Sequence, residues 1–319
     1  MKVEKLRKIF DPREHPLPDG CISHAQSPQT LIGDDGVRIY FSTRSMDPAG
    51  GKFRSRIAYV DMDRTLGRVI GVSNHPVIPL GGLGCFDEHG IFPMNVIRNG
   101  DEVWGYTCGW NRRVSVSVDT AIGLAISRDG GRTFERQGDG PVLGPSLHEP
   151  FLVGDAFVLE VAGQFHMWYI FGTRWVREAD GSGPDRVYKI GHAISSNGRE
   201  WTKEDGIRII SDVLGEDECQ ALPSVVDFAG RYHMVFCYRD VHGFRTDPGR
   251  GYRLGYAWST DLVTWRRDDA ALGLMGTPGD WDADMQCYPH FFVLNGELLL
   301  LYNGNNFGRD GFGLARISM

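Results

Sequence analysis

The sequence predicts an all-β fold, a five-bladed β-propeller whose blades are four-stranded antiparallel sheets. Three segments resemble one another: "IGLAISRDGGRTFER" from Ile122, "IGHAISSNGREWTKE" from Ile190 and "LGYAWSTDLVTWRRD" from Leu254. Weaker copies begin at Arg56 and Phe312, and equivalent positions of the copies lie 67, 68, 64 and 58 residues apart. A repeat of this length without a convincing amphipathic helix is typical of propellers.

Each repeat contains four strand-like segments. A core run and a strand rich in Tyr or Trp come first, as in "QFHMWYIFG" and "RYHMVFCYR". The resembling segment then supplies an alternating strand, a polar turn and a strand with an aromatic such as Phe134, Trp201 or Trp265. The turn "SRDGGRTF" is interpreted as scaffold, because Asp and Gly at these spacings form tight turns.

The last repeat ends at Ser318 and Met319 without its fourth strand. The segment "VEKLRKIF" at residues 3–10 is strand-like and can supply it. Because an unpaired sheet edge favours aggregation, we expect this N-terminal strand to close the ring. The prediction is therefore one domain spanning residues 1–319.

Composition restricts the class of protein. The chain has 319 residues, 41% of them hydrophobic, and a net charge of −7, which argues against nucleic acid or an anionic membrane as partner. No signal peptide or membrane span is recognisable, so we expect a cytoplasmic protein. The six cysteines form no CxxC pair. We therefore expect free thiols, no metal site and no cofactor.

Ionisable and other polar residues gather just before the first strand of each repeat. In a propeller these strand starts converge at one end of the central channel, where a pocket forms. A group of carboxylates in one pocket raises the pKa of at least one of them, which general acid catalysis requires. The alternative is that the acids cap turns or hold a structural cation. The residues concerned are His24, Asp87, Glu88, His89, His148, Glu149, Asp155, Glu216, Asp217, Glu218, Asp282, Asp284 and Gln286.

These motifs carry a resemblance to a known group. In "FDEHGIFP", "MWY" at 167–169, "WDADMQCYP" and "YNGNNFGRDGFGLA" the chain resembles the five-bladed propeller glycosidases. That group includes glycoside hydrolase families 43, 32, 62, 117 and 130, and the chain is most similar to an uncharacterised "glycosylase" branch. The resemblance covers essentially the whole chain and implies the propeller fold and chemistry on a glycosidic bond.

Catalytic roles follow from the resemblance to family 32. Asp155 in "VGDAF" matches the aspartate that stabilises the transition state, and Glu218 in "ECQ" matches the general acid. Ser27 in "QSPQ" stands where the nucleophilic aspartate is expected, so either that role passes to Glu88 or Asp284 or the mechanism differs. We assign Glu218 as general acid and Glu88 as base or nucleophile, and expect them to face each other across the pocket at the wide spacing of an inverting enzyme.

Further residues are predicted to bind the sugar. Trp110, Trp175 and Tyr288 are candidates for stacking on a sugar ring. His24 and His89 can hydrogen-bond hydroxyl groups, and Arg174 and Arg239 follow second strands, where they could hold phosphate. The remaining predicted contacts are Asp87, Glu149, Asp284 and Gln286.

The function predicted from the sequence is hydrolysis of a small glycoside or activated sugar. Two alternatives stay open. The first is a phosphorylase that uses inorganic phosphate as nucleophile, as in family 130. The second is a non-catalytic sugar-binding propeller, which the missing aspartate at Ser27 favours. The partner is a small carbohydrate in each case, and the sequence does not indicate an oligomeric state.

Overall fold

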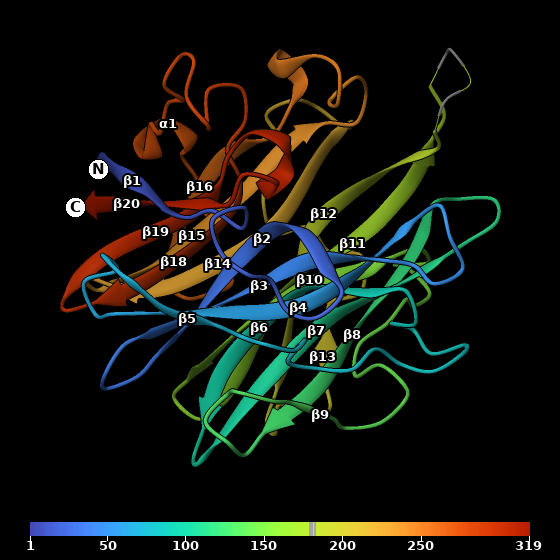
Figure 1. Ribbon diagram of the computed structural model, residues 1–319. Helices are drawn as coiled ribbons and strands as arrows, with labels where there is room; N and C mark the ends of the chain where they lie inside the picture. Colours follow the sequence, from blue (N-terminus) through green and yellow to red (C-terminus); the bar gives the residue numbers. More distant parts are fainter. Residues whose placement is uncertain (179–180, 182) are drawn as a thin grey trace.

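A computed structural model describes residues 1–178, 181 and 183–319 (Figure 1). About half of the chain, 53%, is in β-strands, and only 3% is helical. Two antiparallel sheets of four strands lie in the middle of the chain. The first contains β10 (Val153–Val161), β11 (Gln164–Val176), β12 (Asp185–Ser195) and β13 (Thr202–Lys203). The second contains β14 (Glu218–Phe228), β15 (Arg231–Asp240), β16 (Arg253–Ser259) and β17 (Arg266–Arg267).

The N-terminal part of the chain forms a larger sheet with two antiparallel halves. One half contains β2 (Cys21–Ile32), β3 (Val37–Met46), β4 (Phe53–Met62) and β5 (Val69–Val72). The other contains β6 (Gly90–Asn99), β7 (Glu102–Arg112), β8 (Val118–Ser127) and β9 (Glu135–Arg136). In the described residues, one parallel pair, Ser55 and Gly90, is the strand pairing that joins the two halves. Each half therefore has the strand pattern of the other sheets.

The two ends of the chain meet in one sheet. Its strands are β18 (Cys287–Leu294), β19 (Glu297–Asn303), β20 (Phe312–Ser318) and β1 (Lys2–Phe10), and β1 pairs antiparallel with β20 from Lys2 opposite Ser318 to Phe10 opposite Phe312. Figure 1 shows the two termini side by side at the ends of these strands. The predicted pairing of the N-terminal strand with the last strand is confirmed.

The first strand of each four-stranded unit lies innermost. β2 contacts β6, β6 contacts β10, β10 contacts β14, β14 contacts β18, and β18 contacts β2. Buried apolar clusters lie between consecutive units, as where Tyr106 and Ile122 pack with Met167 and Tyr169. Another cluster joins the last unit to the first through Phe41, Leu301 and Phe312. This circular order of contacts is consistent with a propeller, in which sheets pack face to face around an axis.

The innermost strands share a β-bulge near their first residues. The register shifts between Gly154 and Phe157, between Ala221 and Ser224, and between Cys287 and His290. The bulged residues Asp155, Leu222 and Tyr288 have φ of 52°, 52° and 54°, and Ser27 in β2 has 54°. A non-glycine residue whose backbone lies in this left-handed region is strained by about 1–3 kcal/mol. Bulges at the rims of β structures change the direction in which side chains point. The bulge therefore decides which residue of each strand faces the end of the axis.

The helices are short. They are α1 (Asp269–Leu272) and the 3-10 turns η1 (Pro248–Arg250) and η2 (Asn305–Gly308). In the described part of the chain, no helix has the length and apolar character needed to cross a membrane. The turn at Asp129 has the predicted scaffold contacts, since its carboxylate accepts the N–H groups of Arg132 and Thr133 at 2.9 and 3.0 Å.

Candidate active site

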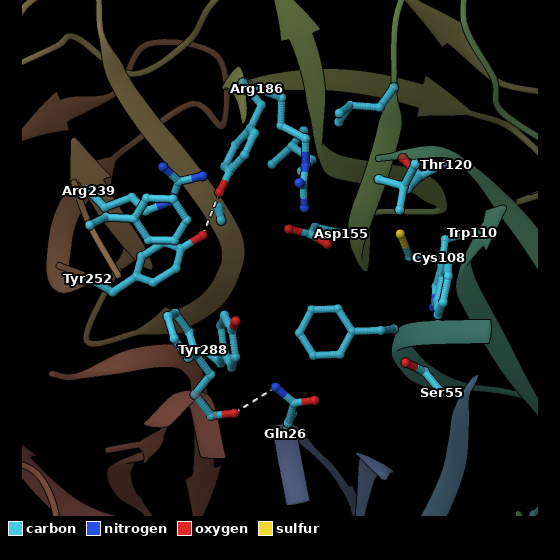
Figure 2. A pocket seen from close by; sticks show the side chains of 18 of the residues that line it. Gln26, Ser55, Cys108, Trp110, Thr120, Asp155, Arg186, Arg239, Tyr252 and Tyr288 are labelled. Atoms are coloured by element: carbon cyan, nitrogen blue, oxygen red, sulfur yellow. Dashed lines mark hydrogen bonds between the residues drawn. The ribbon is translucent and has the colours of Figure 1, made fainter. Parts of the chain in front are cut away.

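A pocket with a volume of about 330 Å³ lies at the bulged end of the innermost strands. Every innermost strand contributes to its wall: Gln26 from β2, Phe92 from β6, Asp155 from β10, Ala221 from β14 and Tyr288 from β18. Figure 2 shows Asp155 near the centre of the lining side chains, with Arg239 and Tyr252 on one side and Cys108, Thr120 and Trp110 on the other. The volume suits a ligand of about one or two sugar units.

Asp155 is the acid of this pocket. Among the described residues that line it, no other side chain is carboxylic. Burial raises the pKa of Asp155 to about 7, although a backbone hydrogen bond from Leu222 and the charge of Arg186 oppose the shift. A carboxyl group with this pKa carries a proton for much of the time at neutral pH and can donate it.

Four arginines line the same pocket, namely Arg44, Arg186, Arg239 and Arg245. Arg239 is 1% exposed, and its guanidinium carbon lies 3.5 Å from the ring centre of Phe244. The ring centres of Tyr188 and Tyr252 are 5.4 and 5.5 Å away, and the two tyrosine hydroxyls are hydrogen-bonded to each other. The pocket therefore combines one acid with an excess of positive charge.

Aromatic side chains cover much of the remaining wall. Phe92 and Tyr288 meet edge to face with ring centres 5.2 Å apart, and Trp110, Phe53 and Phe307 also line the pocket. Aromatic faces suit the C–H groups of a sugar ring, while the hydroxyls of Thr120 and the tyrosines can bond its oxygens. The lining matches the composition of a small-molecule site, apolar with a few polar groups.

The structure corrects the prediction that the acids before the innermost strands gather in the pocket. Asp87, Glu149, Glu218 and Asp282 are at most 1% exposed, and each pairs with a cation on the outermost strand of its own unit. We call these the four buried ion pairs: Asp87 with Arg136 on β9, Glu149 with Lys203 on β13, Glu218 with Arg267 on β17, and Asp282 with Lys5 on β1. In the units that begin with β6, β10, β14 and β18, they connect the start of the first strand to the fourth strand, which is a structural role.

Glu218 shows why these acids differ from Asp155. Its carboxylate accepts N–H groups of Val213 and Leu214 at 2.8 and 2.9 Å and meets Arg267 at 2.5 Å. Burial raises its pKa, but hydrogen bonds from Gln220 and Arg267 outweigh this and lower the pKa overall. A carboxylate held in its ionised form by this many donors does not supply a proton. The geometry therefore argues against the predicted general acid.

Glu88 does not face Glu218 across the pocket, and neither residue lines it. The Glu88 carboxylate accepts the N–H of Gly84 at 3.0 Å inside its own turn. His89 lies next to it with Nδ1 3.2 Å from the Asn111 side-chain oxygen. The opposed pair expected from the sequence is therefore absent from the described residues, because both carboxylates turn toward local donors.

Other predicted contacts also lie outside the pocket lining. Asp284 is exposed on a loop, and Gln286 donates to the carbonyl of Asp282 at 2.5 Å. His24 is buried against Ser23, 2.8 Å away, and burial lowers its pKa to about 4. Arg174 pairs with Asp217 at 2.5 Å, and Trp175 packs beneath Arg186 rather than into the cavity. Of the predicted residues, the structure brings Asp155, Trp110, Arg239 and Tyr288 together in the pocket.

Sequence reasoning missed residues that lie in the third strands or directly before them. Phe53, Thr120, Tyr188 and Tyr252 all line the pocket. Each stands three residues before the aligned repeat position, Arg56, Gly123, Gly191 or Gly255. A repeat-by-repeat comparison of third strands would have found them, whereas the starts of first strands and the ends of second strands do not include them.

The cysteine prediction is confirmed as far as it concerns free thiols. All six cysteines are unpaired, and Cys108, Cys219, Cys237 and Cys287 are buried. Burial raises the pKa of the Cys108 thiol far above its usual range, so this pocket residue is an inert thiol at neutral pH.

Solved structures place the fold in a known class. The chain superposes on a structure described as a glycoside hydrolase with a TM-score of 0.72, 15% identity and coverage of 99% of this chain and 93% of that one. A thermostable family-43 glycoside hydrolase superposes with a TM-score of 0.63 and 14% identity, and the match covers 96% of this chain and 90% of that one. The β-1,2-mannobiose phosphorylase of Listeria innocua superposes with a TM-score of 0.65 and 12% identity, and the match covers 100% of this chain and 97% of that one. The fold is that of the propeller glycosidase group, as the sequence motifs predicted.

The chain belongs to the same protein family as two uncharacterized proteins of Mycobacterium tuberculosis, MT1551 from strain CDC 1551 / Oshkosh and Rv1502 from strain ATCC 25618 / H37Rv. Each is 36% identical over 319 residues, which is 99% of this chain and 99% of the relative. No established family profile matches the sequence.

Proposed function

We propose that this protein is a glycoside-active enzyme, built as one five-bladed propeller domain over residues 1–319, that cleaves a glycosidic bond in the pocket around Asp155. The observation that carries the proposal is the position of Asp155, a carboxyl group with a pKa of about 7 in an aromatic-lined pocket on the axis. The circular contacts of the innermost strands support the blade count. The fold shared with glycoside hydrolases and a phosphorylase supports the reaction class.

Asp155 is the general acid in this proposal, in place of Glu218. Its proton moves to the glycosidic oxygen as the bond from that oxygen to the anomeric carbon breaks, and the carboxylate regains a proton from solvent. The bulge at Asp155 turns its side chain to the pocket while the hydrophobic surroundings keep it protonated. Trp110 and Tyr288 form the platform for the sugar ring.

The nucleophile comes from outside the chain. A retaining mechanism needs a second carboxyl group about 5–5.5 Å from the first. The described lining has only Asp155, because Ser27 and Leu222 occupy the equivalent bulges of β2 and β14. A direct displacement with inversion therefore fits best.

One observation favours phosphorolysis as a second candidate beside hydrolysis. An attacking water must lose a proton to a base, which the lining supplies only through Asp155. Phosphate is already an anion and needs no base, and the pocket holds four arginines. The two reactions differ only in whether water or phosphate forms the new bond to the anomeric carbon.

The test is product analysis of a panel of aryl glycosides and disaccharides by proton and phosphorus NMR, with and without inorganic phosphate. We expect the free sugar or the sugar 1-phosphate, with inverted anomeric configuration. Release that depends on phosphate assigns phosphorolysis. Tight binding of a sugar that is never cleaved would contradict the proposal and favour the non-catalytic alternative.

A further inference from the structure

Arg239 is a buried charge without a countercharge among the residues that the structure describes. Its side chain is 1% exposed, and its only hydrogen bond in the described residues runs from Nη1 to the carbonyl of Asp240 at 2.9 Å. Nε has no partner there, and no carboxylate of the described residues forms an ion pair with the guanidinium. The other deeply buried cations, Lys189 and Arg267, each meet a carboxylate within 2.6 Å. Arg239 is therefore the exception among them.

The aromatic side chains around Arg239 do not replace a countercharge. The attraction between a cation and an aromatic ring is weaker than the cost of removing the charge from water. Burial raises the pKa of Tyr188 and of Tyr252, so both hydroxyls stay neutral at physiological pH. They also bond to each other. The free protein thus keeps an unfavourable charge in the wall of its pocket.

The rest of the pocket adds positive charge. Arg44 stacks on Phe53 with its guanidinium carbon 4.3 Å from the ring centre, and it has no ion pair among the described residues. Arg186 and Arg245 share a single acid, Asp185, at 4.0 and 2.8 Å. Among the described residues of the lining itself, Asp155 is the one carboxylic side chain. Such a cleft concentrates anions from solution.

We propose that the pocket contains an oxyanion subsite built around Arg239, which binds a carboxylate or phosphate group. That group belongs either to an acidic or phosphorylated sugar or to free inorganic phosphate. Guanidinium groups bind both oxyanions through paired, charge-assisted hydrogen bonds, and the bound anion supplies the missing countercharge. The role of the subsite in turnover rests on the proposed function, but binding itself does not.

An anion in this subsite also affects the acid. A negative charge in the same small cavity disfavours the ionised form of Asp155 and so keeps its proton available for the leaving group. Substrate binding then prepares the general acid. This links the charge of the substrate to the chemistry of the pocket.

The first experiment uses the wild-type protein and measures binding by calorimetry and by thermal shift at constant ionic strength. The probes are inorganic phosphate, D-glucuronate, D-galacturonate and D-glucose 1-phosphate, with D-glucose and D-galactose as neutral partners. We expect at least one oxyanion probe to bind tenfold or more tightly than either neutral sugar. Binding of phosphate alone assigns the subsite to the free ion, while binding only of the charged sugars assigns it to the substrate. Equal or weaker binding of every oxyanion probe overturns the proposal.

The second experiment uses two variants. Arg239→Met keeps an unbranched aliphatic side chain next to Phe244 but removes the charge. Arg239→Lys keeps the charge but lacks the planar guanidinium group that binds an oxyanion through two parallel hydrogen bonds. We expect the Met variant to lose oxyanion binding about 100-fold, and the Lys variant about tenfold. Arg266→Met, at an exposed arginine stacked on Trp258, is the matched control and should bind like wild type. Wild-type binding by both Arg239 variants overturns the proposal. If Arg239→Met does not fold, the oxyanion binding of Arg239→Lys and of the wild-type protein tests the proposal.

The Asp155→Asn variant separates this inference from the proposed function. It should bind the oxyanion probes while losing turnover. Oxyanion binding by a wild-type protein that cleaves no glycoside would contradict the function and leave the subsite standing. Cleavage of neutral glycosides, with neither binding nor turnover affected by a charged group on the sugar, would contradict the subsite and leave the proposed function standing.

Discussion

Lys5 on β1 and Asp282 before β18 form an ion pair of 2.7 Å across 277 residues of sequence. The Asp282 side chain is fully buried and also accepts the hydroxyl of Tyr302 at 2.9 Å. The same arrangement recurs in the other buried ion pairs, where an acid before or at the start of the first strand meets a cation on the fourth. In this last unit the fourth strand comes from the other end of the chain. The pair therefore connects the two termini.

Lys5→Met should lower the free energy of unfolding by about 3–5 kcal/mol, because it leaves the Asp282 charge buried without its partner. Urea unfolding followed by tryptophan fluorescence measures this. Lys2→Met, at an exposed position of the same strand, is the control and should change stability by less than about 0.5 kcal/mol. Equal effects of the two substitutions would show that the ion pair does not connect the strands.

Glu218→Gln and Asp155→Asn should separate stability from activity. Glu218→Gln breaks a buried ion pair with Arg267, so it should lower stability while the folded protein keeps its turnover. Asp155→Asn should lose about 10²–10⁴-fold in turnover of glycosides with poor leaving groups, and much less where the leaving group needs no proton. Rates with both classes of aryl glycoside, measured on folded protein, test this. Loss of turnover only in Glu218→Gln would restore Glu218 as the general acid.

Asp155 should also make stability depend on pH. Its pKa is raised from 3.8 to about 7 in the folded protein, so the folded state binds more protons than the unfolded state between these values. Stability from this group therefore falls as pH rises from about 4 to 7. Asp155→Asn should be more stable than wild type at pH 8 by up to about 4 kcal/mol, and the difference should vanish near pH 4. Urea unfolding of both proteins across this range is the measurement, and a constant difference would contradict it.

His290 should have the opposite effect at acid pH. It lies fully buried between Thr30 and Ser224, with Nε2 2.9 Å from the Thr30 hydroxyl and Nδ1 3.4 Å from the Ser224 hydroxyl. Burial lowers its pKa from 6.5 to about 3, so the unfolded state binds the extra proton between these values. Its contribution is complete above about pH 6.5 and is lost as pH falls toward 3.

The measurement is the slope of unfolding free energy against pH between 4 and 6. His290→Gln should lose about 1.4 kcal/mol per pH unit of slope relative to wild type. His75→Gln, at an exposed histidine, is the surface control for the replacement of histidine by glutamine. An unchanged slope in His290→Gln would show that the ring titrates normally in the folded protein.

The sequence alone determined the repeat, the all-β class and the pairing of the N-terminal strand with the last strand. These features depend on local alternation and on similarity between copies, both of which can be read along the chain. It also indicated Asp155, Trp110, Arg239 and Tyr288, which line the pocket. Asp155 and Glu149 nevertheless looked alike in the sequence, as acids near the start of one strand.

Only the tertiary structure decided between such acids. A bulge at Asp155 turns that side chain to the axis, and a bulge changes the facing of every residue beside it. Glu149 instead meets Lys203, which lies 54 residues later on the outermost strand of the same sheet. Whether a carboxyl group keeps its proton depends on the donors and cations that packing brings to it. Those partners come from strands distant in sequence, so the chemistry of Asp155 follows from the assembled sheets.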